Sequence, residues 1–402
     1  MTKNKFLLIV LDGAGDLGKD TPLEVATKPN IDSLAEKGKC GLLDIGYGKQ
    51  GKQVNSDFGY LNILGCYSKD DYPGRGYMEA LGVGLKPGHD ELCIRANFAT
   101  LDDRGNVKDR RAGRDETGLE GFCEKLDGME IDGVRFGLKK SAGHRIVIVI
   151  EAMKGERLSD RVIPNDPFKT GVPLQQIASM DGDRKSKFTA SVLNKFLSRS
   201  HKILVNEPAN KKRKIPANAI MVRNIGRKKD VKSFSKRFGL SGCCVAGVPI
   251  AKGVSRFLDM DVIEVEGANG MPDTNLEGKF EAVEKALKRY DLVFLHINAP
   301  DILSHEAKRL EKQKYIERID KEIGNLKSKV PEDLVFIITC DHRTESEADY
   351  KKYRHTPDPV PFLASGDGIK PNSVNRFDEK SCASGIKLEK NELIPYVMKI
   401  VK

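Results

Sequence analysis

The 402-residue chain has no tryptophan and only 6% aromatic residues, which argues against recognition by stacked bases or by an aromatic cage. No apolar run approaches the roughly 20 residues of a membrane-spanning helix. The short apolar run near the N-terminus ends in Asp12, so it lacks the form of a signal peptide. We therefore expect a cytoplasmic protein with no membrane partner.

Cysteine pairs with metal-binding or redox spacing are also missing. None of the eight cysteines belongs to a C-x-x-C pair, so neither a zinc ribbon nor a thioredoxin-like motif is expected. We expect most of them to be reduced, buried, small hydrophobic residues. The net charge of +10 permits nucleic-acid binding, but the basic residues are scattered. A small anionic substrate suits the same charge, and no nucleic acid partner is expected.

Short apolar runs alternate with helical patterns along the chain. The runs expected to be strands are Phe6–Leu11, Arg145–Ile150, Lys202–Val205, Ala219–Val222, Asp261–Val265, Leu292–Ile297 and Leu334–Thr339. The helical patterns are Asn30–Lys37, Ser186–Leu197, Leu276–Arg289 and Glu306–Leu326. Most runs are continuously apolar, as in parallel strands buried on both faces, so we predict an α/β fold.

A second, smaller domain is expected within the first. Segment 206–217 is polar and basic with two prolines, which is typical of a linker. Residues 66–118 are rich in Gly, Asp and Arg and are expected to form ordered loops that lead into the insert. We predict a core domain at 1–97 and 217–402, and an inserted α/β cap domain at 98–216.

Three apolar runs lead into aspartates, namely Asp12, Asp301 and Asp341. The carboxyl ends of parallel strands meet at one edge of a sheet, so these side chains are expected to converge. His305 lies four residues after Asp301, on the same face of a helix, and His342 follows Asp341 directly. The sequence therefore predicts a cluster of hard oxygen and imidazole ligands.

His355, expected in a loop, completes three carboxylates and three imidazoles. Such a mixed set suits Mn²⁺ or Zn²⁺ better than Mg²⁺ alone, and paired metals recur in phosphoryl transfer. Each residue alone also fits a turn, a cap or an ion pair; it is their shared position after strands that favours a metal site. Ser56, at the start of a helical pattern, is the candidate nucleophile, although Asn55 or Ser56 also suits a simple helix cap.

The motifs occur in an ordered series that resembles a known family. The series includes LDGAGD, TPLEVATKPNIDSLAEKGKCG, NSDFGYLNILG, YPGRGYMEALGVG, RANFAT, DRRAGR, FGLSGCCVAGVPIAKGVSRFLDMDVI, D-x-x-x-H, CDH and H-x-x-DPVP. From Asp12 to near residue 385 it is similar to the archaeal-type, 2,3-bisphosphoglycerate-independent phosphoglycerate mutases of the alkaline phosphatase superfamily. The resemblance implies an alkaline-phosphatase-like, mostly parallel sheet with helices on both faces.

The resemblance also implies two divalent metal sites, with Mn²⁺ favoured over Zn²⁺, Co²⁺ or Mg²⁺. One site would use Asp12, Ser56, Asp341 and His342, and the other Asp301, His305 and His355. Ser56 would be phosphorylated while 2- and 3-phosphoglycerate interconvert, a reaction of glycolysis and gluconeogenesis.

A highly anionic substrate needs fixed cations, and segment 109–114 offers three guanidiniums close together. Candidate substrate-binding residues are Arg110, Arg111 and Arg114, with His144, Arg145, Lys252, Arg75 and Arg95 as weaker candidates. Asp109 and Arg110 are also catalytic candidates, because Asp109 is suited to orient an arginine or to hold the glycerate hydroxyl as a base.

Three positions depart from the family pattern. Tyr60 stands where the family usually has histidine, Asn298 where it usually has lysine, and Arg343 follows Asp341-His342 in place of serine.

The main hypothesis is a mutase, for which the insert is expected to close and exclude water. The alternatives are a metal-dependent phosphatase or phosphodiesterase on the same scaffold, and a basic nucleic-acid-associated protein.

Overall fold

The computed structural model describes residues 4–48, 54–153, 158–347 and 355–401, and the chain divides into two compact units. The first unit comprises residues 1–69 and 231–402, and the second comprises residues 70–230. The second unit is larger than the predicted insert at 98–216, because α4 (Arg75–Gly82) packs on β3 (Leu92–Leu101) and on β10 (Ala219–Gly226). In the described ranges, no helix has both the length and the apolar character needed to cross a bilayer.

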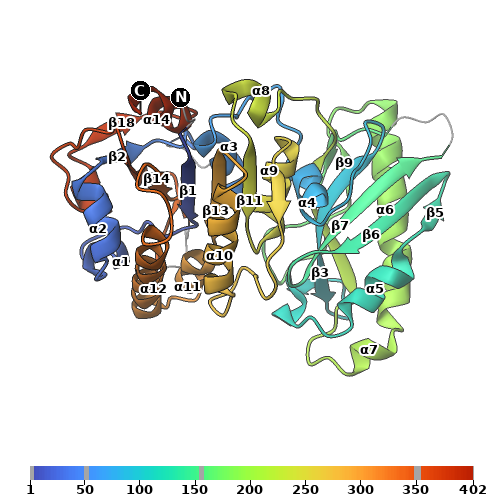
Figure 1. Cartoon of the computed structure of the whole chain (residues 1–402). Coiled ribbons are helices and arrows are strands. Elements are labelled where there is room, and N and C mark those ends of the chain that lie inside the picture. The colour runs from blue at the N-terminus through green and yellow to red at the C-terminus, as the bar shows by residue number, and fades with distance from the viewer. Residues whose placement is uncertain (1–3, 49–53, 154–157, 348–354, 402) are drawn as a thin grey trace. The chain divides into compact units, whose positions relative to one another are not determined.

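An eight-stranded sheet forms the centre of the first unit (Figure 1). Its strands, in spatial order, are β12 (Asp261–Ile263), β11 (Gly242–Val245), β13 (Leu292–Ile297), β1 (Phe6–Leu11), β14 (Val335–Thr339), β17 (Val360–Ser365), β2 (Lys39–Leu43) and β18 (Ile386–Leu388). Among these described strands, β17 alone runs antiparallel to its neighbours. Strands β1, β13 and β14 are buried at every position, as their continuous apolar runs predict.

Helices cover both faces of this sheet. Strand β11 leads through α9 (Pro249–Phe257) to β12, and β12 leads through α10 (Leu276–Leu287) to β13, on the other side of β11. The two crossovers run in opposite directions, so right-handed connections place α9 and α10 on opposite faces. Helix α12 (Arg309–Lys327) packs beside α10 and α2 (Pro29–Glu36), and α3 (Ser56–Ile63) packs beside α9. The predicted mostly parallel sheet with helices on both faces is confirmed.

Shorter elements complete the first unit. They are α1 (Pro22–Val25), α8 (Phe234–Phe238), α11 (Ala299–His305), α13 (Glu379–Cys382), α14 (Leu393–Ile400) and the two-stranded pair β15 (Arg343–Thr344) and β16 (His355–Thr356). All eight cysteines of the chain are free and buried, which confirms the expectation of buried thiols.

The second unit has an antiparallel sheet of its own. Its strands are β10, β3, β7 (Arg145–Ala152), β6 (Val134–Lys140) and β5 (Met129–Ile131) in spatial order, with β4 (Val107–Asp109) paired to β3. The remaining elements are α5 (Leu119–Leu126), α6 (Arg184–Val205), α7 (Pro208–Lys211), the 3-10 turn Ala112–Arg114, β8 (Val162–Ile163) and β9 (Ala178–Ser179). Because side chains alternate along a strand, the two faces of this sheet differ in chemistry.

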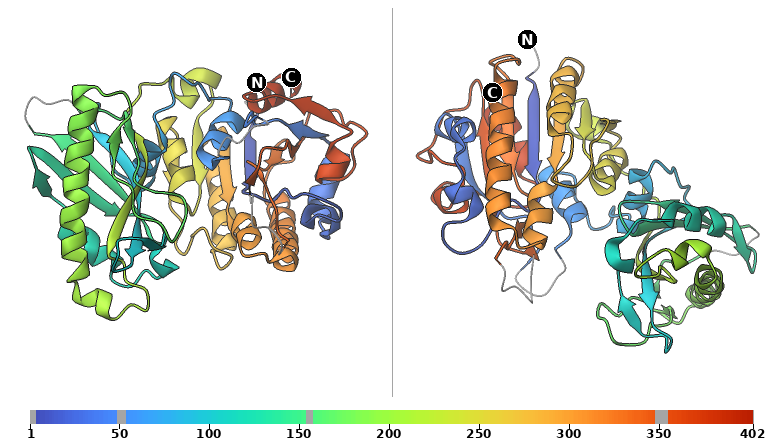
Figure 2. Two further views of the ribbon diagram at one scale, coloured as in Figure 1. Left: turned by 180° about the vertical axis from the view of Figure 1, so that it is seen from behind. Right: turned by 90° about the horizontal axis from the view of Figure 1, so that it is seen from below.

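One face of the antiparallel sheet is apolar and packs on α5 and α6 (Figure 2). Ile94, Ile148 and Ile220 belong to this core, and the ring of Phe136 stacks on that of Phe196 at 4.2 Å. The residues that alternate with this core on β3 and β7 include Arg95, Asn97 and Arg145, which therefore point to the opposite face.

Three strand predictions require correction. Lys202–Val205 is the last turn of α6, because its apolar residues continue the helical period of the preceding turns. Arg145–Ile150 and Ala219–Val222 do form strands, but in the antiparallel sheet. Residues 66–118 contain α4 and the longest strand of that sheet, β3, where loops were expected.

The linker prediction at 206–217 is also wrong. This segment lies inside the second unit, and its Arg213 donates hydrogen bonds to the carbonyls of Ala112, Asp115 and Thr117. Its Asn210 is buried and donates to the carbonyl of Leu204. The basic run is therefore part of the packing of the unit and not a flexible connection.

Candidate active site

The ends of three neighbouring strands place the predicted ligands together. Strand β1 lies between β13 and β14, so Asp12 and Asp341 leave the sheet at the same edge. Gly13 follows with φ +58°, and its amide donates to Oδ1 of Asp341 at 3.1 Å. A Cβ at Gly13 would lie 2.6 Å from Oγ1 of Thr344 and 2.7 Å from Oδ1 of Asp301, so only glycine allows this approach.

Asp12, Asp341 and His342 form the first group of potential metal ligands, with one ligand atom of each within 4.8 Å of the others. Oδ1 of Asp12 and Oδ2 of Asp341 are buried and accept no hydrogen bond from the described part of the chain. Burial and the neighbouring Asp12 raise the pKa of Asp341 well above its usual value, because two close carboxylates repel each other. A divalent cation would satisfy both oxygens, so these residues fit a metal.

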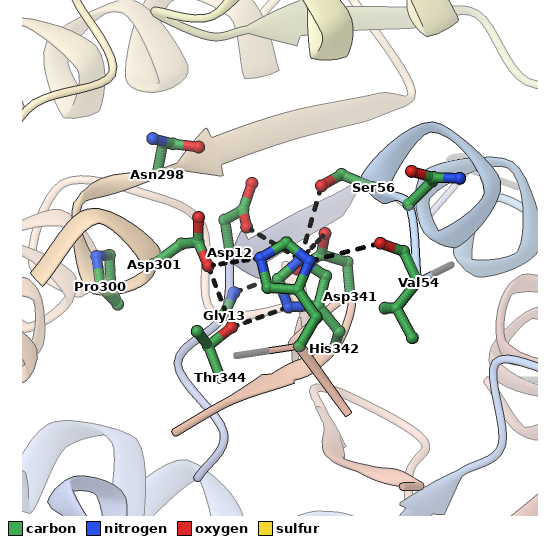
Figure 3. A network of polar contacts seen from close by, with 12 residues as sticks. Asp12, Gly13, Val54, Ser56, Asn298, Pro300, Asp301, Asp341, His342 and Thr344 are labelled. Atoms are coloured by element: carbon green, nitrogen blue, oxygen red, sulfur yellow. Dashed lines mark hydrogen bonds and ion pairs between the residues drawn. The ribbon is translucent and has the colours of Figure 1, made fainter. Parts of the chain in front are cut away.

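The ring of His342 directs its Nε2 atom toward Asp12 and Asp341. Its Nδ1 lies 2.9 Å from Oγ1 of Thr344, whose hydroxyl donates to Oδ1 of Asp301 at 2.9 Å (Figure 3). Since that hydroxyl proton is already used, Nδ1 of His342 must carry the proton, and Nε2 keeps its lone pair. Burial, followed by the neighbouring His355, lowers the pKa of His342 to about 3, which keeps the ring neutral.

Asp301, His305 and His355 form the second group. Asp301 and His305 lie one turn apart on α11, and their closest atoms, Oδ2 and Nε2, are 3.3 Å apart. His355, predicted in a loop, begins the short strand β16; its Nε2 lies 3.2 Å from Oδ1 of Asp301 and 2.9 Å from Nε2 of His305. Burial acts to raise the pKa of Asp301, but His355 and His305 hold it well below its usual value.

The two groups touch each other. The rings of His342 and His355 stack with centroids 3.9 Å apart, and Thr344 bridges His342 and Asp301 through hydrogen bonds. The structure thus brings all six predicted acidic and imidazole residues into one site of the first unit.

Ser56 completes this site at the start of α3. It is the first residue of the helix, and Asn55 occupies the N-cap position without a side-chain hydrogen bond to the helix. Oγ of Ser56 lies 3.5 Å from Nε2 of His342. A Cβ at Gly59 would lie 3.0 Å from Cβ of Asp341, so glycine allows the helix to come this close. The backbone amide groups at the start of α3 favour an anion beside Ser56.

The three positions that depart from the family pattern have clear contacts. The hydroxyl of Tyr60 donates to Oδ2 of Asp12 at 2.5 Å. Nδ2 of Asn298 donates to the carbonyl of Gly270 at 2.8 Å. Nε of Arg343 donates to the carbonyl of Pro359 at 2.7 Å, which links β15 to the residue before β17.

A group of arginines lies in the second unit. Arg110 donates to both oxygens of Asp166, at 3.0 and 2.7 Å, and Nε of Arg223 lies 3.1 Å from the same carboxylate. The ring of Phe168 contacts both guanidiniums, at 5.3 Å from Cζ of Arg110 and 5.2 Å from Cζ of Arg223. Burial lowers the pKa of Arg223 to about 10. Two cations thus share one carboxylate and one aromatic ring.

The polar face of β3 and β7 adds further cations. Arg95 is buried, and its Nε lies 3.2 Å from Oε1 of Glu79, which also pairs with Arg75 at 3.3 Å. Burial and the neighbouring Arg75 lower the pKa of Arg95 well below its usual value. Arg145 is close enough to lower the pKa of Glu79. Cations outnumber carboxylates on this face, so it is suited to bind an anion.

The other candidate substrate-binding residues differ in their exposure. Arg111 precedes the 3-10 turn and Arg114 ends it, and both are exposed. Oδ1 of Asp109 accepts a hydrogen bond from the amide of Arg111 at 2.6 Å. Burial, followed by Arg145 and Arg111, lowers the pKa of His144 to about 3. Lys252 belongs to the first unit, where it pairs with Glu264.

Several residues of these sites were not found from the sequence. They are His296, Thr344, Asp166, Phe168 and Arg223. Thr344 could have been suspected from the sequence, since it lies two residues after His342. The others have no local motif, because their roles depend on which strands and loops the fold brings together.

The chain is similar over nearly its whole length to several known proteins. Residues 4–390 match the model of the Metalloenzyme superfamily. A 2,3-bisphosphoglycerate-independent phosphoglycerate mutase of Methanococcus aeolicus is 36% identical over 95% of this chain and 93% of its own length. A relative of that name from Archaeoglobus fulgidus is 38% identical over 94% of this chain and 93% of its own length.

Solved structures of two archaeal proteins are also similar. A protein of Pyrococcus horikoshii matches with a TM-score of 0.81 and 30% identity, covering 100% of this chain and 98% of its own. The cofactor-independent phosphoglycerate mutase of Thermoplasma acidophilum matches with a TM-score of 0.66 and 32% identity, covering 99% and 100%. The chain belongs to the Metalloenzyme superfamily and, within it, to the family of archaeal 2,3-bisphosphoglycerate-independent phosphoglycerate mutases.

Proposed function

We propose that the chain interconverts 2- and 3-phosphoglycerate through a phosphoserine on Ser56. The names of its relatives support this reaction. The observation that carries the proposal is the position of Ser56 Oγ, 3.5 Å from Nε2 of His342 at the edge of two groups of potential metal ligands. The reaction belongs to glycolysis and gluconeogenesis, for which we expect a cytoplasmic enzyme.

We further propose that the site holds two divalent ions, with Mn²⁺ favoured by the mixed carboxylate and imidazole donors. The ligands of one ion would be Asp12, Ser56, Asp341 and His342, and those of the other Asp301, His305 and His355. When bound, such ions neutralise charge on the phosphoryl group and on the attacking and leaving oxygens. Thr344 and the carbonyl of Val54 would orient His342 and His355, since each faces the Nδ1 atom of one ring.

The proposed chemistry has two symmetrical transfers. Oγ of Ser56 forms a bond to phosphorus while the bond from phosphorus to a hydroxyl oxygen of glycerate breaks. Ser56 loses its hydroxyl proton, and the departing oxygen gains one. The neighbouring hydroxyl of glycerate then loses its proton and forms a bond to phosphorus, while the bond from phosphorus to Oγ of Ser56 breaks and Oγ regains a proton. The start of α3 supports this cycle, because backbone amides there favour the phosphate on Ser56.

The arginines on the polar face of β3 and β7, together with those around Asp166, are proposed to bind the anionic groups of the substrate. Arg110 and Arg145 are the favoured residues among those predicted. Arg95, a weaker candidate from the sequence, and Arg223, which was not predicted, join them. Arg111, Arg114, His144 and Lys252 are proposed for weaker contacts. Asp109 is proposed to act with Arg110, because it fixes the turn that follows that arginine.

Phosphorus NMR of 3-phosphoglycerate incubated with the full chain and Mn²⁺ tests the function. A mutase produces the signal of 2-phosphoglycerate at constant total organic phosphate. Release of inorganic phosphate without that signal would identify a phosphatase, and an unchanged spectrum would remove phosphoglycerate as the substrate.

A further inference from the structure

Tyr60 and His296 meet one oxygen of Asp12, and neither residue takes part in the chemistry proposed above. The hydroxyl of Tyr60 donates to Oδ2 of Asp12 at 2.5 Å. Nε2 of His296 lies 2.7 Å from that hydroxyl and 3.0 Å from the same Oδ2. Tyr60 and His296 are fully buried and Asp12 is 2% exposed. Polar atoms so far from water are costly unless they satisfy one another, so this contact needs an explanation.

A count of protons fixes the direction of the hydrogen bonds. Tyr60 has a single hydroxyl proton, and it points to Asp12. The oxygen of Tyr60 therefore accepts from His296, and Nε2 of His296 must carry a proton. That N–H also faces Oδ2 of Asp12, so this one oxygen faces two donors.

The other oxygen of Asp12 is in the opposite situation. Oδ1 is buried and accepts no hydrogen bond from the described part of the chain, and it lies 3.5 Å from Nε2 of His342. Because Oδ2 is held on one side, the carboxylate cannot rotate freely, and Oδ1 stays directed at the ligand group. We infer that Tyr60 and His296 are positioning residues that present Asp12 to the metal through Oδ1 alone. The inference rests on the metal-binding part of the proposed function and not on its substrate.

The fold explains how these two residues reach Asp12. Tyr60 lies one turn after Ser56 on α3, and its ring packs edge-on against His296 with centroids 5.0 Å apart. The strand register pairs His296 with Val10, two residues before Asp12, so these side chains share one face of the sheet. The helix that carries the candidate nucleophile is thereby attached to a candidate metal ligand.

Calorimetric titration of the metal-stripped full chain with Mn²⁺ tests this inference. Tyr60→Phe keeps the ring and removes only the donor, so we expect about a 10–100-fold rise in the Kd of one site and no change at the other. The Mn²⁺ concentration for half-maximal activity should rise in parallel, and saturating Mn²⁺ should restore most of the turnover. Tyr396→Phe is the matched control, because this partly buried tyrosine of the same unit packs on Phe362 and should leave both sites unchanged.

A second variant provides an independent measurement. His296→Gln should weaken the same site. The double variant should lose less Mn²⁺ binding free energy than the sum of the two single losses, because both donors act on one oxygen.

Two sites of wild-type affinity in Tyr60→Phe would overturn the inference; if that variant does not fold, the titration of His296→Gln decides in the same way. A wild-type chain that binds no Mn²⁺ overturns the inference as well. If Mn²⁺ binds as expected and depends on Tyr60 but phosphoglycerate is not converted, the proposed function fails and the inference stands.

Discussion

The hydroxyl oxygen of Ser56 lies 3.5 Å from Nε2 of His342, the ring nitrogen that keeps its lone pair because Nδ1 faces Thr344. Ser56→Ala removes the oxygen that would receive the phosphoryl group, so kcat should fall on the order of 10⁴-fold or more. Coupled assay of phosphoglycerate conversion measures this loss, and a phosphopeptide containing residue 56 should be recovered only from the wild type. Ser328→Ala, at an exposed position, is the control. Activity near the wild-type value in Ser56→Ala would exclude this serine as the nucleophile.

Removal of divalent ions should abolish activity, and Mn²⁺ should restore it. Removal of the ions should also lower the Tm, because a ligand that binds only the folded state stabilises that state by about 4 kcal/mol at a thousand times its Kd. Asp341→Asn relieves the repulsion between two close carboxylates. We therefore expect its metal-free Tm to equal or exceed that of the wild type, and its gain on adding Mn²⁺ to be smaller. Thermal unfolding with and without Mn²⁺ checks both statements; full activity after chelation would contradict the metal proposal.

Phe168 holds a strained and exposed position beside two arginines. Its φ is +59°, its side chain is 56% exposed, and its ring contacts Arg110 and Arg223. Phe168→Leu removes the aromatic face from both guanidiniums, and about 1 kcal/mol of lost orientation corresponds to a KM raised roughly fivefold at similar kcat. Phe168→Trp should retain a KM near that of the wild type. Steady-state kinetics with 3-phosphoglycerate makes the comparison, and equal KM values for the two variants would show that the ring does not orient the arginines.

Glu79 gives the second unit a pH-dependent part of its stability. Burial acts to raise the pKa of Glu79, but Arg75 and Arg95 lower it below its usual value. A lowered pKa means that the stabilisation is present above the pKa of the unfolded chain and is lost as the pH falls through the folded value. At pH 7, Glu79→Gln should cost about 3–5 kcal/mol, because it leaves buried arginine charge uncompensated.

The measurement for this variant is urea unfolding followed across pH. The difference between the wild type and Glu79→Gln should shrink as the pH falls below about 4. Glu130→Gln removes an exposed pair with Arg135 and should cost less than about 1 kcal/mol at any pH. A constant difference between pH 7 and pH 3 would show that the charge of Glu79 is not the source of its contribution.

The sequence was most informative where local pattern determines position. Asp12 and Asp341 follow continuous apolar strands, and Asp301 and His305 share one face of a helix, so their convergence could be predicted. The contacts of Tyr60 and His296 could not, because they depend on how closely α3 packs against the sheet. Gly59 permits that approach, but a single glycine in a helical pattern does not reveal what it faces.

The second unit was harder to predict for a related reason. Its strands are apolar on one face and arginine-rich on the other, but β3 lies in a stretch dominated by Gly, Asp and Arg. Lys202–Val205 has β-branched and apolar residues, yet the preceding turns of α6 continue through it. Arg223 lies at the bulge between Val222 and Asn224, and only the folded sheet brings it to the carboxylate of Asp166.

The central place of β1 in its sheet has one more consequence. Its backbone is hydrogen-bonded to strands on both sides, and the amide of Asp12 extends this pairing by donating to the carbonyl of Ile297 at 2.9 Å. Amide hydrogens in such a strand exchange with solvent only when most of the surrounding structure opens. Bound ions can therefore leave while this backbone stays protected from exchange, whereas in denaturant the site and the sheet around it should disappear in a single cooperative step.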